Sequence, residues 1–350
     1  MSLIDSEEIK EQTRNLWRTC FHDSEDFMDI YFEEKYSDEN NFTIRHDGQV
    51  ISAMQMLPYA LSVYKSVAHV GYVSGLATLP QYRRQGLAGR LLNESIRKLN
   101  AQGGIISFLV PADNKLREFY QRPANGAYWT TTFRTEMKFE IPADKDHEYP
   151  DFSLEEPDEW GEEIYVFYRR MQRNEPFTLR AAENDFFAAV RDCDAEGGHT
   201  LVVRHNGNIC GLCIANPIAD GRILVQDLVY SKEDALYTIL RHLRDAYPEK
   251  ELFTYMEVGG EAKGARAYAM ARIVNVKRFF NLVINAFPGF QLHVGVGDDY
   301  AVPENNGYYK IGNGKCVVTD ERPTTILTPG GLASLFLSAY PLQMRLLLDE

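Results

Sequence analysis

The sequence has little of what marks secreted or membrane proteins. It contains only five cysteines in 350 residues, which are too few and too scattered for a disulfide framework. No apolar run reaches the roughly 18 residues of a membrane-spanning helix. The first residues, MSLIDSEEIKEQ, lack the basic and apolar regions of a secretory signal. These absences predict a reduced, cytoplasmic protein with no membrane partner.

Positive charge is also scarce. The 37 Lys and Arg residues are outnumbered by 50 Asp and Glu residues, which gives a formal net charge of −13. An acidic surface repels nucleic acid, attracts cations and increases solubility. We therefore expect no nucleic-acid partner and a cationic small-molecule ligand, although solubility alone is the simpler explanation of the charge.

Several chemical signatures are absent as well. The eight histidines are dispersed along the sequence. The Gly-x-Ser-x-Gly motif that would indicate a hydrolase is absent. Cys210-x-x-Cys213 has redox or zinc spacing, but it lies within an expected strand and has no second pair. Asp298, Asp299 and Glu304 flank an expected turn, and turn chemistry explains them. We expect no metal site and a core role for the paired cysteines.

Residues 73–92, VSGLATLPQYRRQGLAGRLL, carry the strongest positive signal. An apolar strand runs into Arg83-x-x-Gly86-x-Ala88 and then into an amphipathic helix. Glycine adopts backbone conformations closed to other residues and lets a ligand approach closely. The free amides of a first helical turn bind anions, assisted by the helix dipole. The pattern predicts a pyrophosphate-binding loop, and a plain surface loop that caps a helix is the alternative.

The order of strand, R-x-x-G-x-A and helix resembles motif A of the GCN5-related N-acetyltransferases (GNAT), which bind acetyl-CoA there. The resemblance implies acetyl-CoA as cosubstrate, held by the end of the strand, the loop and the start of the helix. The implied cofactor-binding residues are Leu76, Ala77, Thr78, Arg83, Arg84, Gln85, Gly86, Leu87, Ala88, Gly89 and Asn114.

Turn signals and hydrophobic periodicity predict the elements around this motif. We expect two helices over 7–36, a hairpin that turns at Asp47-Gly48, a strand over 71–79, a helix over about 87–101, a buried parallel strand over 105–111, and a helix capped by Asn114 that ends near Tyr120. This order is that of the GNAT fold.

A second block repeats the opening of the first. It predicts a hairpin over 201–217, a strand over 222–231 and a helix over 232–246, but no glycine or arginine stands where the phosphate loop would be. We interpret it as a degenerate copy. Further strands and a closing helix follow from residue 259 onward. The whole order resembles the Eis family, which joins an active acetyltransferase domain, an inactive copy and a sterol-carrier-like tail.

The predicted fold is therefore α/β (α+β) in three parts. We expect a GNAT domain with a mixed twisted sheet over residues 1–138, a degenerate GNAT-like domain over 139–258 and a sterol-carrier-protein-2-like α/β domain over 259–350. The apolar segment 332–348 suits a core as well as an interface, so a homo-oligomer stays open.

Acetyl transfer needs an acid for the leaving thiolate and a base for the amine. Tyr120 stands in F-Y-x-x-x-x-x-G-A-Y, two residues longer than the family's spacing, and the resemblance implies that it is the acid. Packing is the alternative for one of 20 tyrosines. The Eis resemblance implies the terminal carboxylate of Glu350 as the base. It also implies that Asp26, which we expect in the loop between the first two helices, and Phe27 form part of the amine pocket. Solvated acidic groups are the alternative for Asp26 and Glu350.

We expect an acetyl-CoA-dependent N-acetyltransferase that acts on a primary amine of a small cationic molecule, such as an aminoglycoside or a polyamine. One alternative is a protein that binds acyl-CoA or another hydrophobic ligand through a regulatory or vestigial site. Another is a protein-lysine acetyltransferase. The phosphate loop together with Tyr120 favours an enzyme over a carrier.

Overall fold

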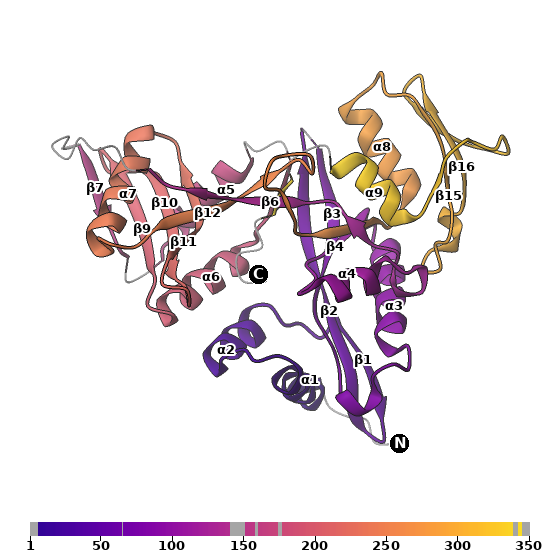
Figure 1. Cartoon of the computed structure of the whole chain (residues 1–350), viewed down its shortest axis with the longest axis horizontal. Helices are drawn as coiled ribbons and strands as arrows, with labels where there is room; N and C mark the ends of the chain where they lie inside the picture. Colours follow the sequence, from indigo (N-terminus) through magenta and orange to yellow (C-terminus); the bar gives the residue numbers. More distant parts are fainter. Residues whose placement is uncertain are drawn as a thin grey trace. The chain divides into compact units, whose positions relative to one another are not determined.

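The computed structural model describes residues 6–64, 66–140, 151–157, 160–173, 177–338 and 342–344. The chain forms two compact units (Figure 1). Unit 1 comprises Met1–Phe133 with Val258–Leu342, and unit 2 comprises Arg134–Glu257 with Gln343–Glu350. The predicted α/β class is confirmed, because both units contain substantial helices and strands. The division into three domains at residues 138 and 258 stays a prediction.

The first sheet of unit 1 grows from a long antiparallel hairpin. The turn at Asp47-Gly48 has positive φ at both residues, as two-residue hairpins require. β1 (Asn41–His46), β2 (Gln49–Val63) and β3 (Ser66–Thr78) are antiparallel neighbours, and β4 (Ile106–Leu109) is parallel to β3. The helices are α1 (Ser6–Cys20), α2 (Glu25–Glu34), α3 (Leu87–Ala101) and α4 (Asn114–Gln121), with a 3-10 turn η1 (Pro80–Tyr82) before α3. The elements predicted over 7–121 are confirmed.

Two local predictions need correction. Asp113, not Asn114, caps α4, because its side chain accepts a hydrogen bond from the Leu116 amide. Aspartate and asparagine are equally good caps, so the sequence did not distinguish these neighbours. Asp26 lies in the first turn of α2 and not in the loop before it, because Ser24 caps that helix.

A strand from the C-terminal part of the chain also belongs to the first sheet. β14 (Met270–Ile273) is antiparallel to β4 on one side and to β5 (Trp129–Thr130) on the other. All four of its residues are buried. The sequence predicts this strand only as part of the tail, because the pattern of a strand does not identify its partner.

The remainder of unit 1 forms a second, smaller sheet. β15 (Leu292–Val296), β16 (Gly307–Gly312) and β17 (Lys315–Thr319) are antiparallel, and β18 (Ile326–Leu327) joins β15 in parallel. α8 (Val276–Ala286) and α9 (Pro329–Leu337) lie beside this sheet (Figure 1). β13 (Arg266–Ala267) precedes β14, and a 3-10 turn, η3 (Pro303–Asn305), precedes β16. The strands and closing helix predicted for the tail are thus present.

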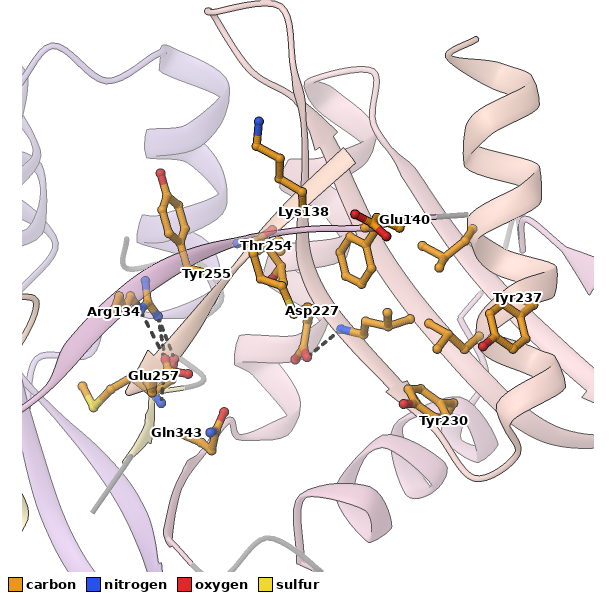
Figure 2. A pocket seen from close by; sticks show the side chains of 17 residues that line it. Arg134, Lys138, Glu140, Asp227, Tyr230, Tyr237, Thr254, Tyr255, Glu257 and Gln343 are labelled. Carbon is orange, nitrogen blue, oxygen red and sulfur yellow. Dashed lines mark hydrogen bonds and ion pairs between the residues drawn. The ribbon is translucent and has the colours of Figure 1, made fainter. Parts of the chain in front are cut away.

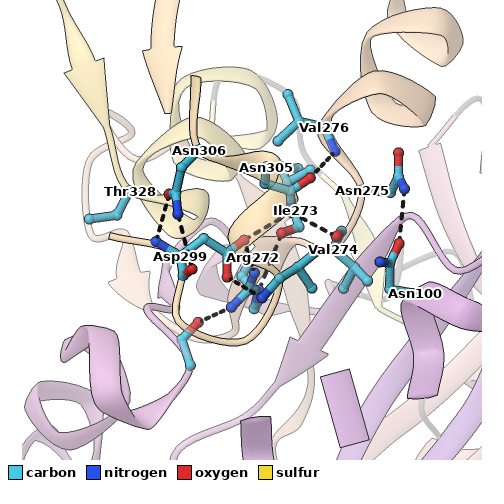
Figure 3. A network of polar contacts seen from close by, with 12 residues as sticks. Asn100, Arg272, Ile273, Val274, Asn275, Val276, Asp299, Asn305, Asn306 and Thr328 are labelled. Carbon is cyan, nitrogen blue, oxygen red and sulfur yellow. Dashed lines mark hydrogen bonds and ion pairs between the residues drawn. The ribbon is translucent and has the colours of Figure 1, made fainter. Parts of the chain in front are cut away.

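A buried ion pair connects β14 to the loop after β15 (Figure 3). Arg272 donates hydrogen bonds to Asp299 Oδ2 at 2.6 Å and to the Gly126 carbonyl at 2.8 Å. Asn305 donates to the same carboxylate oxygen, and the Val302 amide donates to the other. The two charged side chains are 1% and 0% exposed. The turn chemistry that the sequence suggests for Asp299 therefore does not account for its buried partner, Arg272.

Unit 2 repeats the order of hairpin, strand, helix and parallel strand. β9 (His199–His205) and β10 (Asn208–Pro217) flank an Asn-Gly turn, β11 (Ile223–Tyr230) is antiparallel to β10, and β12 (Leu252–Val258) is parallel to β11. β6 (Phe133–Lys138) borders β12, and β7 (Phe152–Glu155) borders β9. The other elements are α5 (Glu162–Arg173), β8 (Phe177–Arg180), α6 (Glu183–Ala195), α7 (Glu233–Ala246) and β19 (Gln343–Met344), which is parallel to β8.

The paired cysteines of unit 2 behave as core residues. Cys210 and Cys213 are buried in β10 among apolar side chains of this unit. Burial raises the pKa of both thiols, which disfavours the thiolate that redox or zinc chemistry needs. None of the five cysteines is in a disulfide. No helix of the described residues is long and apolar enough to span a bilayer.

Removal of the Asp299 carboxylate should destabilise unit 1, because the Arg272 guanidinium would stay buried without its counter-charge. We expect Asp299→Ala to lower the free energy of unfolding by about 3–5 kcal/mol, measured by urea denaturation with tryptophan fluorescence. The control is Asp298→Asn at an exposed position with φ 58°, which asparagine tolerates. Equal stability of the two variants would contradict this role of the ion pair.

Candidate active site

The site begins where β3 and β4 part. The two strands are paired from Val70 and Ile106 to Tyr72 and Phe108, whereas β3 continues to Thr78. Beyond Tyr72, that edge of β3 has no strand partner among the described residues. Such an edge offers backbone hydrogen-bonding groups to an extended ligand.

The loop between β3 and α3 has an unusual backbone. Gly86 precedes α3 with φ 77°, and Arg84 has φ 65°. An ideal Cβ at Gly86 would meet no atom within 4 Å, so the backbone conformation and not crowding requires glycine there. The left-handed conformation of Arg84 costs about 1–2 kcal/mol. Strain of this kind is concentrated at ligand-binding sites.

A cavity of about 410 Å³ lies at the end of β3, with walls from the loop, α3, α4 and the end of α1. Most of the predicted site residues of this region line it. They are Leu76, Ala77, Thr78, Arg83, Arg84, Gly86, Ala88, Gly89 and Tyr120. The structure therefore brings the phosphate loop, the open strand edge and the tyrosine together around one space.

Five lining residues were missed from the sequence: Cys20, Phe21, Tyr82, Leu116 and Phe119. Cys20 is the last residue of α1 and Phe21 follows it, and both reach the cavity only through tertiary folding. Leu116 and Phe119 share one face of α4 with Tyr120, since residues three and four apart are neighbours on a helix. That spacing would have identified both.

Three predicted cofactor residues do not line the cavity: Gln85, Leu87 and Asn114. Gln85 lies in the loop, and the other two are the first residues of α3 and α4. Their side chains are therefore outside the walls, although the Leu87 amide belongs to the first turn of α3.

The predicted acceptor and base residues lie elsewhere. Asp26 is exposed on α2, and Phe27 stacks on Tyr31 with ring centroids 6.1 Å apart. Neither lines the cavity at the end of β3. Glu350 lies outside the described residues.

Tyr120 lies in the last turn of α4 and is 8% exposed. Its ring packs edge-on against Phe119 and Tyr128, with centroids 5.2 and 6.2 Å away. Burial raises the pKa of Tyr120, and Tyr128 adds a smaller effect in the same direction. No hydrogen bond to its hydroxyl is found within the described part of the chain. The phenol is thus protonated, lines the cavity and is available to a ligand.

The two extra residues after Tyr120 are accommodated in a 3-10 turn, η2 (Pro123–Asn125). The Tyr128 amide donates to the Tyr120 carbonyl at 2.9 Å, so the loop returns to the end of α4. Tyr128 and Ser107 share a buried hydroxyl–hydroxyl hydrogen bond at 2.8 Å. The longer spacing therefore leaves Tyr120 on the cavity wall.

Gly89 allows α3 to pack on η2 beside the cavity. An ideal Cβ at Gly89 would lie 2.6 Å from Asn125 Oδ1 and 2.8 Å from the Ala124 carbonyl oxygen. Asn93 Nδ2 stabilises this contact, because it donates hydrogen bonds to the Gly89 and Ala124 carbonyls, both at 2.8 Å. The absence of a side chain at Gly89 thus serves packing as well as the cavity.

Unit 2 keeps the scaffold but not the loop. β11 and β12 pair only at Ile223–Leu252 and Leu224–Phe253, and a second cavity of about 440 Å³ opens beyond that point (Figure 2). The helix that follows β11 is preceded by Lys232, without a glycine or a side-chain cap. This difference fits a copy that has lost its phosphate site.

The second cavity also carries buried carboxylates. Asp227 and Glu257 line it, and Arg134 donates to Glu257 at 3.1 Å (Figure 2). Tyr168 donates a hydrogen bond to Asp227. Burial raises the pKa of Glu257, although Arg134 opposes that shift. Carboxylates on the wall disfavour a phosphate group.

The family comparison concerns roughly the first third of the chain. Residues 3–123 match the family model described as an acetyltransferase (GNAT) domain. The chain carries a GNAT acetyltransferase domain. It is therefore an acetyltransferase whose acceptor the match leaves open, and GNAT enzymes in general use acetyl-CoA. No curated protein matches the sequence.

Solved structures share the fold over nearly the whole chain. A GCN5-related N-acetyltransferase from Anabaena variabilis aligns with a TM-score of 0.73 at 20% identity and covers 96% of this chain and 89% of its own. Eis1 from Mycobacterium abscessus aligns at 0.70 and 15% identity, over 95% and 88%. A GCN5-related N-acetyltransferase from Kribbella flavida aligns at 0.70 and 14% identity, over 96% and 88%. At these identities the likeness concerns the fold alone.

Gly89→Ala tests the packing of the GNAT domain beside its cavity. Alanine is favoured over glycine in a helix by about 1 kcal/mol, but here its Cβ would press on the Ala124 carbonyl. We expect the cost of overpacking to exceed this gain in helix propensity. The free energy of unfolding, measured by urea denaturation, should fall by about 1–3 kcal/mol.

The matched control is Gly331→Ala in α9, where the nearest atom to an ideal Cβ is 3.4 Å away. This variant should be neutral or stabilising. A stabilising Gly89→Ala would contradict the close contact with η2.

Proposed function

We propose that the chain transfers an acetyl group from acetyl-CoA to a primary amine of a small cationic acceptor, and that the cavity at the end of β3 binds acetyl-CoA. The observation that carries this proposal is the convergence of the open β3 edge, the arginine-glycine loop and Tyr120 on one cavity. A carrier of acyl-CoA would need the first two but not the third.

Each part of the cofactor has a matching part of the site. The pantetheine arm would bind along Leu76–Thr78 as an added strand. The pyrophosphate would accept hydrogen bonds from the first amides of α3, where the helix dipole favours negative charge. Arg83 Nε donates to the Thr78 carbonyl at 3.0 Å, which holds the base of this guanidinium against the strand. Positive charge is therefore fixed where the phosphates would lie.

The proposed reaction uses these positions. The neutral amine attacks the thioester carbonyl, the tetrahedral oxyanion collapses, and the carbon–sulfur bond breaks. Tyr120 would donate its proton to the leaving thiolate. Because a phenol has a reference pKa near 10 and a thiol one near 8.5, this transfer must be coupled to bond cleavage, as is ordinary for a general acid. The amine would lose its proton to a base, for which we propose the terminal carboxylate of Glu350.

A cationic acceptor fits the charges of α2. Arg14 and Arg18 both pair with Glu25, whose pKa is lowered to about 2 by these contacts, and Arg14 also pairs with Asp29. Asp26 is exposed and has no ion pair among the described residues. Its uncompensated charge would attract an ammonium group, with Phe27 beside it. The acyl-CoA carrier and the protein-lysine acetyltransferase are the alternatives.

Other features of the prediction remain proposals of the same kind. Helices α8 and α9, together with the four-stranded sheet of β15, β16, β17 and β18, fit a sterol-carrier-like tail. Five unpaired cysteines fit a reducing, cytoplasmic location. The apolar end of the chain fits contact with a second copy of this chain as well as a core.

Thiol release from acetyl-CoA, measured with purified protein against aminoglycosides, polyamines and amino-acid amides, tests the proposed function. We expect turnover with one of these classes. Gly86→Glu should abolish both acetyl-CoA binding and turnover, because it places bulk and negative charge in the phosphate loop.

The matched control is Gly48→Glu. Gly48 also has positive φ, 82°, and open space around an ideal Cβ, so this variant carries the same backbone strain outside the cavity. Retained acetyl-CoA binding by Gly86→Glu would refute the site. If the wild type binds acetyl-CoA but turns over none of these amines, the carrier or protein-lysine alternatives would be favoured.

Tyr120→Phe separates catalysis from packing. The substitution keeps the ring contacts with Phe119 and Tyr128 and removes only the hydroxyl, so acetyl-CoA affinity should stay the same. Turnover should fall about 10²–10⁴-fold if the hydroxyl is the general acid, measured as kcat of thiol release beside acetyl-CoA affinity by calorimetry. An unchanged kcat would remove Tyr120 from the mechanism.

A further inference from the structure

Unit 2, which lacks the phosphate loop, contains a cluster of side chains that can bind a metal ion. Glu156, His199 and His242 place one potential ligand atom each within 4.8 Å of one another. His199 Nδ1 is 3.1 Å from both carboxylate oxygens, and His242 Nε2 is 3.0 Å from Oε1. The expectation that the histidines do not cluster is wrong for these two, which the fold brings together from distant positions.

We propose that Glu156, His199 and His242 bind a divalent transition-metal ion of the zinc class. Two imidazoles and one carboxylate are the ligands of open zinc sites, in which water occupies the fourth position. Ligand atoms at about 2.0–2.1 Å from a tetrahedral ion lie roughly 3.3 Å apart. The His–Glu separations of 3.0–3.1 Å already approach that value, so an ion could replace the shared protons after small side-chain movements.

Regular structure positions the donors. His199 is the first residue of β9 and is paired with Ala215 of β10. Its ring packs edge-on against Tyr247, with centroids 5.3 Å apart, and lies 5.8 Å from the ring of His242. His242 belongs to α7. Donors on strands and helices are held more accurately than donors on loops.

The third donor joins an edge strand to this pair. Glu156 directly follows β7, whose last residue, Glu155, is paired with Val202 of β9. Its side chain is 46% exposed, and those of His199 and His242 are 22% and 36% exposed. An ion can therefore enter from solvent. Once bound, it would link β7, β9 and α7, and its binding would be coupled to the stability of unit 2.

A hydrogen-bonded His–Glu–His cluster without metal is the competing explanation. It needs hydrogens on the nitrogens that face the carboxylate, whereas metal binding needs free lone pairs there. The two explanations therefore differ in whether zinc displaces protons from the site.

Zinc binding to the full-length protein tests the proposal. Protein freed of metal with a chelator is titrated with zinc chloride by calorimetry, and its melting temperature is measured with and without zinc. We expect one zinc per chain, release of protons on binding, and a higher melting temperature. His242→Gln and Glu156→Gln should each weaken binding at least about tenfold and abolish the zinc-dependent rise in melting temperature.

The matched control is His205→Gln, at the other end of β9 from His199, which should bind zinc as the wild type does. Cobalt substitution identifies the ligands, because a nitrogen and oxygen site gives no thiolate charge-transfer band although the chain has five free cysteines. Three outcomes would overturn the proposal: no stoichiometric zinc in the wild type, unchanged binding in both variants, or thiolate bands with cobalt. Circular dichroism of each variant before titration separates lost folding from lost binding.

Discussion

The buried guanidinium of Arg272 is the constraint on which unit 1 depends. A buried cation without a partner costs several kcal/mol, so the segments that carry its acceptors must meet around it. Asp299 supplies the charge from the loop after β15, and the Gly126 carbonyl supplies a second acceptor. Gly126 ends the 3-10 turn that follows Tyr120. The tail therefore helps to fix the loop behind one wall of the candidate active site.

The elements that the sequence predicted correctly are those defined by local signals. Asp47-Gly48 can form a tight turn from its own dihedral preferences, and the length of α3 follows from its amphipathic period and the glycines after it. β14 has no such signal, because four buried residues fit many sheets. Asp299 resembled a turn residue because no local pattern indicates its partner, Arg272, which lies in a different element.

The residues of the candidate site also fall into those that local sequence signals predict and those that only the fold brings together. The motif around Gly86 placed eight cofactor residues on the cavity because strand, loop and helix are contiguous. Cys20 and Phe21 reach the cavity through the packing of α1, which no spacing in the sequence encodes. The same limit hid the contact between His199 and His242. Local chemistry is readable from one chain, whereas convergence of distant segments requires the fold.

The two units share an order of elements but differ in the loop that leads into the next helix. Both have an antiparallel hairpin, a pair of parallel strands that are paired over only part of their length, and a cavity beyond the last paired residues. What differs is the connection into the next helix: Gly86 with two arginines in one case, Lys232 with carboxylates nearby in the other. The scaffold provides a place for a ligand, and a few loop residues decide which ligand it accepts.

The position of β14 has a consequence for the order in which the protein folds. Arg272 follows Gly126 by 146 residues, and the chain leaves the ribosome from its N-terminus. During synthesis β4 must wait for its second neighbour until all of residues 134–257 have emerged. An unpaired strand edge is a template for pairing with other chains. The entropy of closing so long a loop rises only slowly with length, so the cost of this topology is the time for which the nascent sheet stays open.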